Sequence, residues 1–159
     1  MGADVYFSTP GVASVRWDEP SATVVVEWEG WANTAEFAAL LDAEIKALRE
    51  RGASRMLADC RRQRVLNPAD QERAEREWTP RAIEAGLKRF AVVLPISDVA
   101  AANLKERLGS ATSAIRIHYF AAVEEAKEWL PLTRLRATRG SRPFSRARRG
   151  ASASSRGGA

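Results

Sequence analysis

The residues best suited to chemistry in this chain lie together between Asp59 and Asn67. Asp59, Cys60, Arg61 and Arg62 follow a short apolar segment, and α/β proteins commonly bind their ligands where a strand ends. The Cys60 thiolate could act as a nucleophile, because neighbouring arginines lower a thiol pKa from its free value of about 8.5. Alternatively, the arginine side chains could hold an anion such as a phosphate or a lipid head group, helped by a helix N-terminus at Asn67.

Each of these hypotheses has a simpler structural alternative. A free cysteine at a strand end is often a small buried residue, and a thiol nucleophile needs a nearby base, whereas the only histidine, His118, is on a later strand. Asp70 and Glu72 would weaken the attraction for an anion. We therefore favour a buried Cys60, a solvated arginine loop and an Asp59 side chain that caps this loop.

The pattern of apolar residues predicts the elements that position these side chains. Alternating or continuous apolar runs predict five strands, and apolar residues at helical spacing predict about four helices. The expected strands cover residues 12–17, 23–28, 55–60, 89–95 and 114–120, and the expected helices cover 33–52, 67–86, 97–109 and 122–130. A hairpin followed by alternating helices and strands predicts an α/β fold with a mixed sheet.

Several helix ends carry local signals. Asn33 and Glu36 have the spacing of a capping box, and Asn67 with the following proline is typical of a helix start. Gly52 and Gly86 stand where glycine commonly follows a helix C-terminus. These signals predict the ends of the first two helices.

Trp78 lies next to a helix-breaking residue, Pro80. We expect the second helix either to end near Trp78 or to kink at Pro80. Trp78 could then present its ring to a partner or a second subunit, since aromatic residues are enriched at interface centres, or it could pack in the core. Trp31, in a loop, is the tryptophan most expected to be exposed.

The charge of the chain is unevenly distributed. The net charge is +5, but residues 133–159 hold eight Arg and no acid, which leaves 17 Lys and Arg against 20 Asp and Glu in residues 1–132. We expect one domain over 1–132 and a disordered basic tail over 133–159. The tail could bind nucleic acid or an anionic membrane non-specifically, or have no role; the acidic body predicts no specific nucleic-acid binding.

A single cysteine excludes an intramolecular disulfide and a multi-cysteine metal site. We expect no metal and no cofactor. The N-terminus lacks the pattern of a secretory signal, and the apolar runs are shorter than the roughly 20 residues that span a bilayer. The cytoplasm is the expected compartment.

A set of motifs resembles a known family. The motifs are ADC at 58–60, NPADQE at 67–72, WTPRAIEAGLK at 78–88, AVVLP at 91–95 and YFAAVEEAKEWL at 119–130. Over residues 12–130 the chain resembles the SpoIIAA-like proteins, bacterial STAS domains also labelled STAS/SEC14. The resemblance implies an α/β STAS domain related to anti-sigma factor antagonists, which dock a partner kinase and are switched by serine phosphorylation.

The resemblance fails at the switch serine itself, which the family places after the third strand in an Asp-Ser-Gly-like context. Here Asp59 is followed by Cys60 and Arg61, Ser54 precedes the strand, and the next hydroxyl is on Thr79. We therefore expect a non-enzymatic regulatory or scaffold module that contacts a protein partner or forms a homodimer. The alternatives are a small-ligand or lipid-binding protein with an anionic head-group site at the arginines, and a thiol enzyme. The candidate site residues are Asp59, Cys60, Arg61, Arg62, Asn67 and Trp78.

Overall fold

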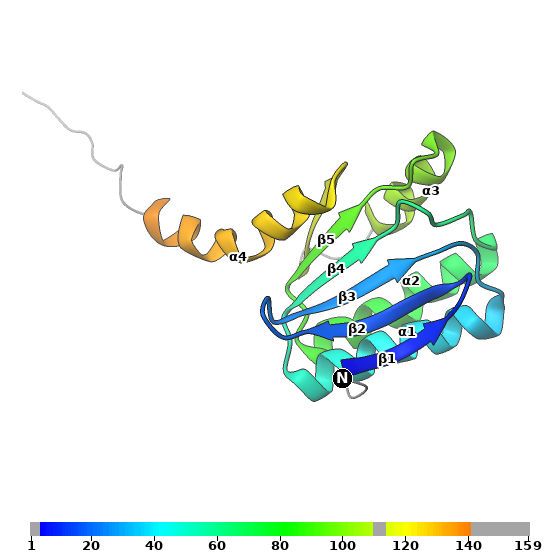
Figure 1. Ribbon diagram of the computed structural model, residues 1–159, viewed down its shortest axis with the longest axis horizontal. Coiled ribbons are helices and arrows are strands. Elements are labelled where there is room, and N and C mark those ends of the chain that lie inside the picture. Colours follow the sequence, from blue (N-terminus) through cyan, green and yellow to red (C-terminus); the bar gives the residue numbers. More distant parts are fainter. Residues whose placement is uncertain (1–3, 110–113, 141–159) are drawn as a thin grey trace, which may run out of the picture.

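The computed structural model describes residues 4–109 and 114–140 (Figure 1). Six strands and four helices lie in these residues. The strands are β1 (Val5–Thr9), β2 (Ala13–Asp18), β3 (Thr23–Trp28), β4 (Arg55–Asp59), β5 (Arg89–Val93) and β6 (Arg116–Phe120). The helices are α1 (Thr34–Arg51), α2 (Pro68–Ala85), α3 (Asp98–Gly109) and α4 (Val123–Gly140). None of these helices is both long and apolar enough to cross a bilayer.

The strands form one mixed sheet in the order β1-β2-β3-β4-β5-β6. The first three strands are antiparallel neighbours, and β3 to β6 run parallel. The predicted α/β fold with a mixed sheet is confirmed, with six strands in place of five. The additional strand is β1, which pairs only with β2, is partly exposed along its length and shifts register between Val5 and Phe7. An edge strand of this kind lacks the alternating buried face from which strands are predicted.

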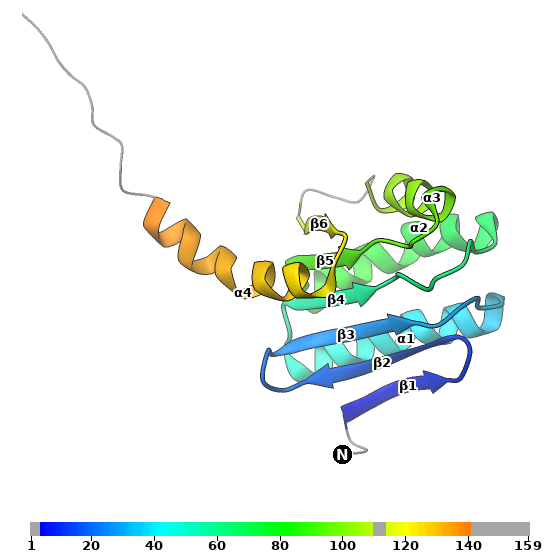
Figure 2. The ribbon, with the colours of Figure 1, turned by 45° about the horizontal axis from the view of Figure 1, so that its top comes forward.

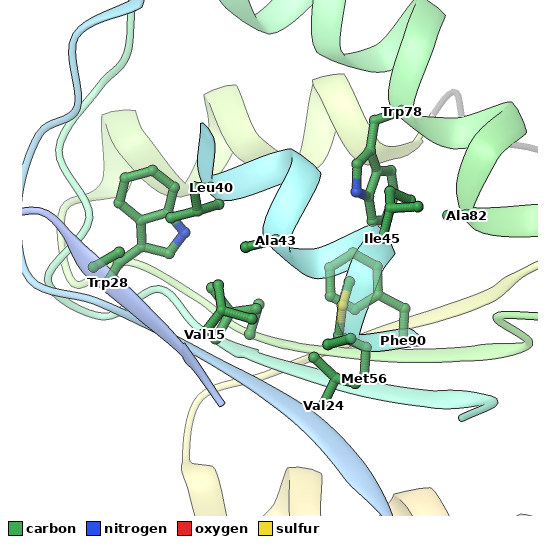
Figure 3. Packing of buried hydrophobic residues seen from close by; sticks show 14 of the residues in the cluster. Val15, Val24, Trp28, Leu40, Ala43, Ile45, Met56, Trp78, Ala82 and Phe90 are labelled. Atoms are coloured by element: carbon green, nitrogen blue, oxygen red, sulfur yellow. The ribbon is translucent and has the colours of Figure 1, made fainter. Parts of the chain in front are cut away.

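Helices cover the two faces of the sheet unequally (Figure 2). Helices α1 and α2 pack side by side on one face, and together with β2 to β5 they enclose the larger core (Figure 3). Helix α4 covers β4, β5 and β6 on the other face, where Ala126 and Leu130 pack against Leu57, Ala91 and Val93. The central parallel strands are therefore buried on both sides, which explains their continuous apolar sequences.

The predicted helix ends are confirmed. The Asn33 side chain accepts a hydrogen bond from the Glu36 amide (2.8 Å), and the Glu36 carboxylate accepts one from the Asn33 amide (2.9 Å). The Asn67 side chain accepts from the Ala69 amide at 2.8 Å. Gly52 and Gly86 end α1 and α2 with φ of 59° and 107°, a conformation that glycine adopts without steric cost.

Neither α2 nor α4 ends at its interior proline. Helix α2 runs from Pro68 to Ala85 with Pro80 inside it, so the alternative that it ends near Trp78 is wrong, and the alternative of a kink at Pro80 stays a prediction. Packing of Trp78 and Ala82 in the core holds both halves of α2 and outweighs the roughly 3 kcal/mol that an interior proline costs. Helix α4 continues through Pro131 to Gly140, so residues 133–140 of the predicted disordered tail belong to this helix. Residues 141–159 lie outside the described residues.

Predicted strand ends differ from the structure by one or two residues. Strands β4 and β5 end at Asp59 and Val93, before Cys60 and Pro95, and β6 begins at Arg116. Cys60 and Ile115, just outside β4 and β6, are buried in the core, and an apolar sequence alone does not distinguish such residues from strand residues.

Candidate functional site

Three loops meet at the carboxyl ends of β3, β4 and β5. The Arg64 amide in the loop after β4 donates to the Gly30 carbonyl in the loop after β3 (3.1 Å). The Ile96 amide in the loop after β5 donates to the Arg61 carbonyl (3.2 Å), and the Cys60 amide donates to the Val93 carbonyl (2.9 Å). These backbone hydrogen bonds hold the loops together as one surface.

Asp59 and Arg61 form a closed pair within this surface. The Asp59 carboxylate accepts hydrogen bonds from Nε (2.9 Å) and Nη2 (2.8 Å) of Arg61 and also from the Arg61 amide (3.2 Å). The predicted capping of the loop by Asp59 is thus confirmed. Burial raises the pKa of the Asp59 carboxyl, but the hydrogen bonds from Arg61 and the charges of Arg61 and Arg62 outweigh it. The pKa therefore lies below its ordinary value of 3.8.

The Asp59–Arg61 pair should contribute to the free energy of unfolding in a pH-dependent way. A carboxyl whose pKa is depressed in the folded state stabilises the fold above its unfolded pKa, and the contribution disappears as the pH falls through the folded-state pKa. We expect Asp59→Asn to lower the free energy of unfolding at pH 7 by at most about 1 kcal/mol, since the pair is partly exposed to solvent. The difference between wild type and variant should vanish well below pH 3.8. Urea unfolding at pH 7 and at successively lower pH measures it, and a difference that does not shrink as the pH falls below 3.8 would contradict the assignment.

Most polar side chains in and around the predicted anion site form hydrogen bonds within the protein. Arg61 is paired with Asp59, and the Asn67 side chain is bound to the Ala69 amide. Arg62 is exposed. Asp70 is buried, and the Thr34 hydroxyl donates its hydrogen to the Asp70 carboxylate, 2.9 Å from Oδ2 and 3.1 Å from Oδ1, so the contact links the N-termini of α2 and α1. The anion site at Arg61 and Arg62 stays a prediction, and these contacts weaken it.

Cys60 and His118 lie on opposite faces of the sheet. Cys60 is 3% exposed and packs in the larger core beneath α1 and α2. His118 stacks on the α4 face, with its ring centre 5.1 Å from that of Phe120 and 5.2 Å from that of Trp129. The sheet therefore separates the thiol from the only imidazole in the chain, and the two cannot form a nucleophile–base pair.

Trp78 is buried, which corrects the expectation that its ring could be presented to a partner. Only 7% of it is exposed, and its ring centre lies 6.0 Å from that of Phe90 (Figure 3). It lines a mostly apolar hollow of about 50 Å³ between α1, α2 and the sheet, next to Cys60 and Glu44. Ligand pockets for drug-sized molecules have volumes of roughly 300–1,000 Å³, so this hollow is too small for a lipid chain.

A group of exposed apolar residues occupies the same edge of the sheet as the three loops. Trp31, Val65, Ile96 and Val99 are 48%, 46%, 79% and 72% exposed, and we refer to these four residues as the apolar edge patch. Trp31 and Val65 border an open hollow of about 560 Å³ that Ser97 also lines. The exposure of Trp31 confirms its prediction.

Sequence reasoning missed the other three members of the patch. Val65 and Ile96 lie in loops, and Val99 is the second residue of α3. The sequence did hold one indication of the patch: Val65 follows β4, and Ile96 and Val99 follow β5. An isolated apolar residue is common on protein surfaces, and only the arrangement of the loops brings these side chains to one edge.

Comparisons with known proteins agree with this architecture. No model of a protein family matches the chain, and no curated protein sequence matches it. One similar solved structure is a proposed anti-sigma factor antagonist from Thermotoga maritima, with a TM-score of 0.52, 12% identity, and coverage of 73% of this chain and 92% of that one. Another is an uncharacterised protein of the DUF3478 family with a SpoIIAA-like fold from Shewanella loihica PV-4, with a TM-score of 0.53, 12% identity, and coverage of 78% and 98%.

The chain therefore adopts a SpoIIAA-like fold. The predicted fold is confirmed. At 12% identity the likeness concerns the fold alone, and function has to be argued from the surface of this chain.

Proposed function

We propose that this protein is a non-enzymatic regulatory or scaffold module that binds a protein partner through the apolar edge patch. The observation that carries the proposal is that Trp31, Val65 and Ile96, on loops joined by backbone hydrogen bonds, and Val99, near the start of α3, are exposed at one edge of the sheet. Of the large apolar residues exposed in the described part of the chain, only Val5 lies elsewhere. Exposed large apolar residues grouped at one edge of a protein often mark interaction sites.

The composition of the patch suits a protein partner. Burying a large aliphatic or aromatic side chain completely contributes roughly 1.5–3 kcal/mol. The four patch residues are 46–79% exposed, so their burial would contribute a part of this each, against the cost of association. Arginines 62 and 64 lie beside the patch and are exposed. An apolar centre with charged residues at its rim is the usual composition of a protein interface.

The mode of regulation differs from that of a phosphorylated antagonist. The loop after β4 reads CRRQRVL and contains no serine or threonine. Partner binding in this proposal therefore does not depend on phosphorylation of that loop. A similar solved structure is described as a proposed anti-sigma factor antagonist, which supports regulation by protein contact as the general mode.

The alternatives have less support. A lipid-binding protein needs an apolar cavity, and the hollow at Trp78 has about 50 Å³. A thiol enzyme needs a base near Cys60, and His118 lies across the sheet. A homodimer through the apolar edge patch is compatible with the surface, and the experiment below distinguishes it from a different partner.

We expect the double variant Ile96→Asp, Val99→Asp to reduce partner binding at least tenfold, because a loss of about 1.4 kcal/mol already has that effect and two apolar contacts are removed. The matched control is Val5→Asp, which changes a residue of 48% exposure on β1. Photo-crosslinking from position 65 in cells, with mass spectrometric identification, detects the partner, and sedimentation velocity of the purified variants detects a homodimer.

The proposal is supported if a crosslinked protein is lost in the double variant and retained in Val5→Asp. If this protein is a second copy of the chain, sedimentation shows a dimer that the double variant alone dissociates. Equal crosslinking in all three proteins, or none in the wild type, would refute the proposed function.

A further inference from the structure

Three arginines stand side by side at the opposite edge of the sheet. Arg55, Arg89 and Arg116 are the first residues of β4, β5 and β6, and the parallel register pairs Arg55 with Arg89 and Arg89 with Arg116. Residues paired in a parallel sheet point to the same face, and adjacent strands are about 4.8 Å apart. The three side chains therefore start within about 10 Å of one another, on the face that α4 covers.

In the part of the chain that the structure describes, the positive charges in this row are not paired with carboxylates. Arg55 donates from Nη1 to the Ser21 carbonyl at 3.1 Å. The Arg89 Nη1 is buried without a hydrogen-bond partner, and its guanidinium lies 5.8 Å from the centre of the Trp129 ring.

The electrostatic environment of Arg89 agrees with this geometry. Burial, followed by the charges of Arg116 and Arg55, lowers the pKa of Arg89 from its ordinary value. The charged groups that act on it are thus both positive. A buried donor without a partner is costly to the fold, and a bound anion would remove this cost.

The row opens onto a hollow that could receive a ligand. This hollow has a volume of about 460 Å³ and is lined by the three arginines, Lys88, Ser54 and Leu130. Its volume is in the range of small-molecule sites, roughly 300–1,000 Å³. Figure 2 shows α4 beside the amino ends of β4 and β5, where Leu130 forms one wall.

The helix ends at this edge offer a competing explanation for the arginines. Helices α1 and α2 end at Gly52 and Gly86, just before β4 and β5, and cations are favoured near helix C-termini. Helices α1 and α2, however, pack on the face of the sheet opposite to the row. Compensation of the helix ends therefore does not account for three guanidiniums gathered around a hollow on the α4 face.

We propose that Arg55, Arg89 and Arg116, with Lys88, form a binding site for a ligand that carries two or more adjacent phosphate groups. Guanidinium groups bind phosphate oxygens through two parallel N–H donors, and a row about 10 Å long accommodates more than one phosphate. Leu130 and the ring of Trp129 would contact the organic part of the ligand. This site is separate from the apolar edge patch and does not depend on the proposed function.

The test uses pyrophosphate as the probe and the full chain, so that the basic C-terminal residues are the same in every protein. Isothermal titration calorimetry in low salt should detect binding to the wild type, and Arg89→Gln should weaken it at least tenfold. Arg62→Gln, which removes the same charge from an exposed loop at the other edge, should change the affinity less than about twofold. Arg116→Gln changes an exposed residue and tests the site independently if Arg89→Gln does not fold.

A second arm distinguishes a soluble phosphate ligand from a lipid head group. Vesicles of phosphatidylcholine with and without phosphatidylinositol bisphosphate are sedimented with the same variants. Loss of pyrophosphate or vesicle binding in Arg89→Gln or Arg116→Gln, but not in Arg62→Gln, supports the site and identifies the source of the phosphate. Equal affinities in Arg62→Gln and the row variants, or no binding to either probe, would overturn the proposal.

Discussion

Replacing Trp78 with alanine is expected to lower the free energy of unfolding by about 3–5 kcal/mol, the largest effect of any single substitution considered. The side chain is 7% exposed and packs against Phe90 in the larger core. Its removal would enlarge the existing hollow of about 50 Å³, and the surrounding helices can collapse only partly into the space. Urea unfolding followed by circular dichroism measures the change.

Two further variants test whether the loss of stability comes from the burial of Trp78 and how much of it depends on an aromatic ring. Trp31→Ala removes the same side chain from a position of 48% exposure and should change stability by less than about 0.5 kcal/mol. Trp78→Phe keeps a ring against Phe90 and removes the buried indole N–H, which has no hydrogen-bond partner, so its cost should stay under about 1.5 kcal/mol. Similar losses for the alanine variants at 78 and 31 would show that Trp78 is not a core residue.

Gly30→Ala should destabilise the protein by about 1–3 kcal/mol through a direct clash of atoms. A Cβ at position 30 would lie 2.7 Å from the carbonyl oxygen of Gly11, in the turn between β1 and β2. The two segments are held together by hydrogen bonds from the amides of Glu29 and Gly30 to the Val12 carbonyl (2.9 and 3.3 Å). The turn would have to move away, and the pairing of β1 with β2 would weaken.

Gly52 is the matched control because it is required for a different reason. No atom lies within 4 Å of a Cβ built at Gly52, but its φ is +59°. Asparagine tolerates this left-handed conformation better than alanine does, so Gly52→Asn should cost less than Gly52→Ala. At Gly30 asparagine should cost at least as much as alanine, since any Cβ meets the Gly11 carbonyl. Thermal unfolding of the four variants shows whether alanine or asparagine costs more at each position. If asparagine were the less costly residue at Gly30 as well as at Gly52, the clash would be contradicted.

The fold of this chain was predictable from its sequence to the extent that its signals are local. The capping box at Asn33 and Glu36 acts within one turn of helix, and Asn67 bonds an amide two residues away. The valine-rich strands could be recognised because burial on both faces demands continuous apolar sequence. Strand β1 could not, since it is a half-exposed edge strand whose position depends on β2.

The candidate site was less predictable because its parts come from separate segments. The sequence pointed to residues 59–62, where charges are neighbours in the chain, but in the structure Asp59 and Arg61 neutralise each other. The apolar edge patch and the arginine row combine residues from different loops or strands. Each arginine by itself is an ordinary first residue of a strand, and only the register of three parallel strands aligns them.

The amino-acid sequence was thus sufficient to establish the ends of the first two helices, the central strands, the α/β class and the lack of a serine after β4. These properties follow from hydrogen bonds and apolar patterns that extend over a few residues. The tertiary structure alone decided that Trp78 is buried, that Cys60 and His118 face opposite sides of the sheet, and that Arg55, Arg89 and Arg116 form a row. The physical reason is that burial and strand register depend on contacts between segments far apart in the chain, which no local pattern encodes.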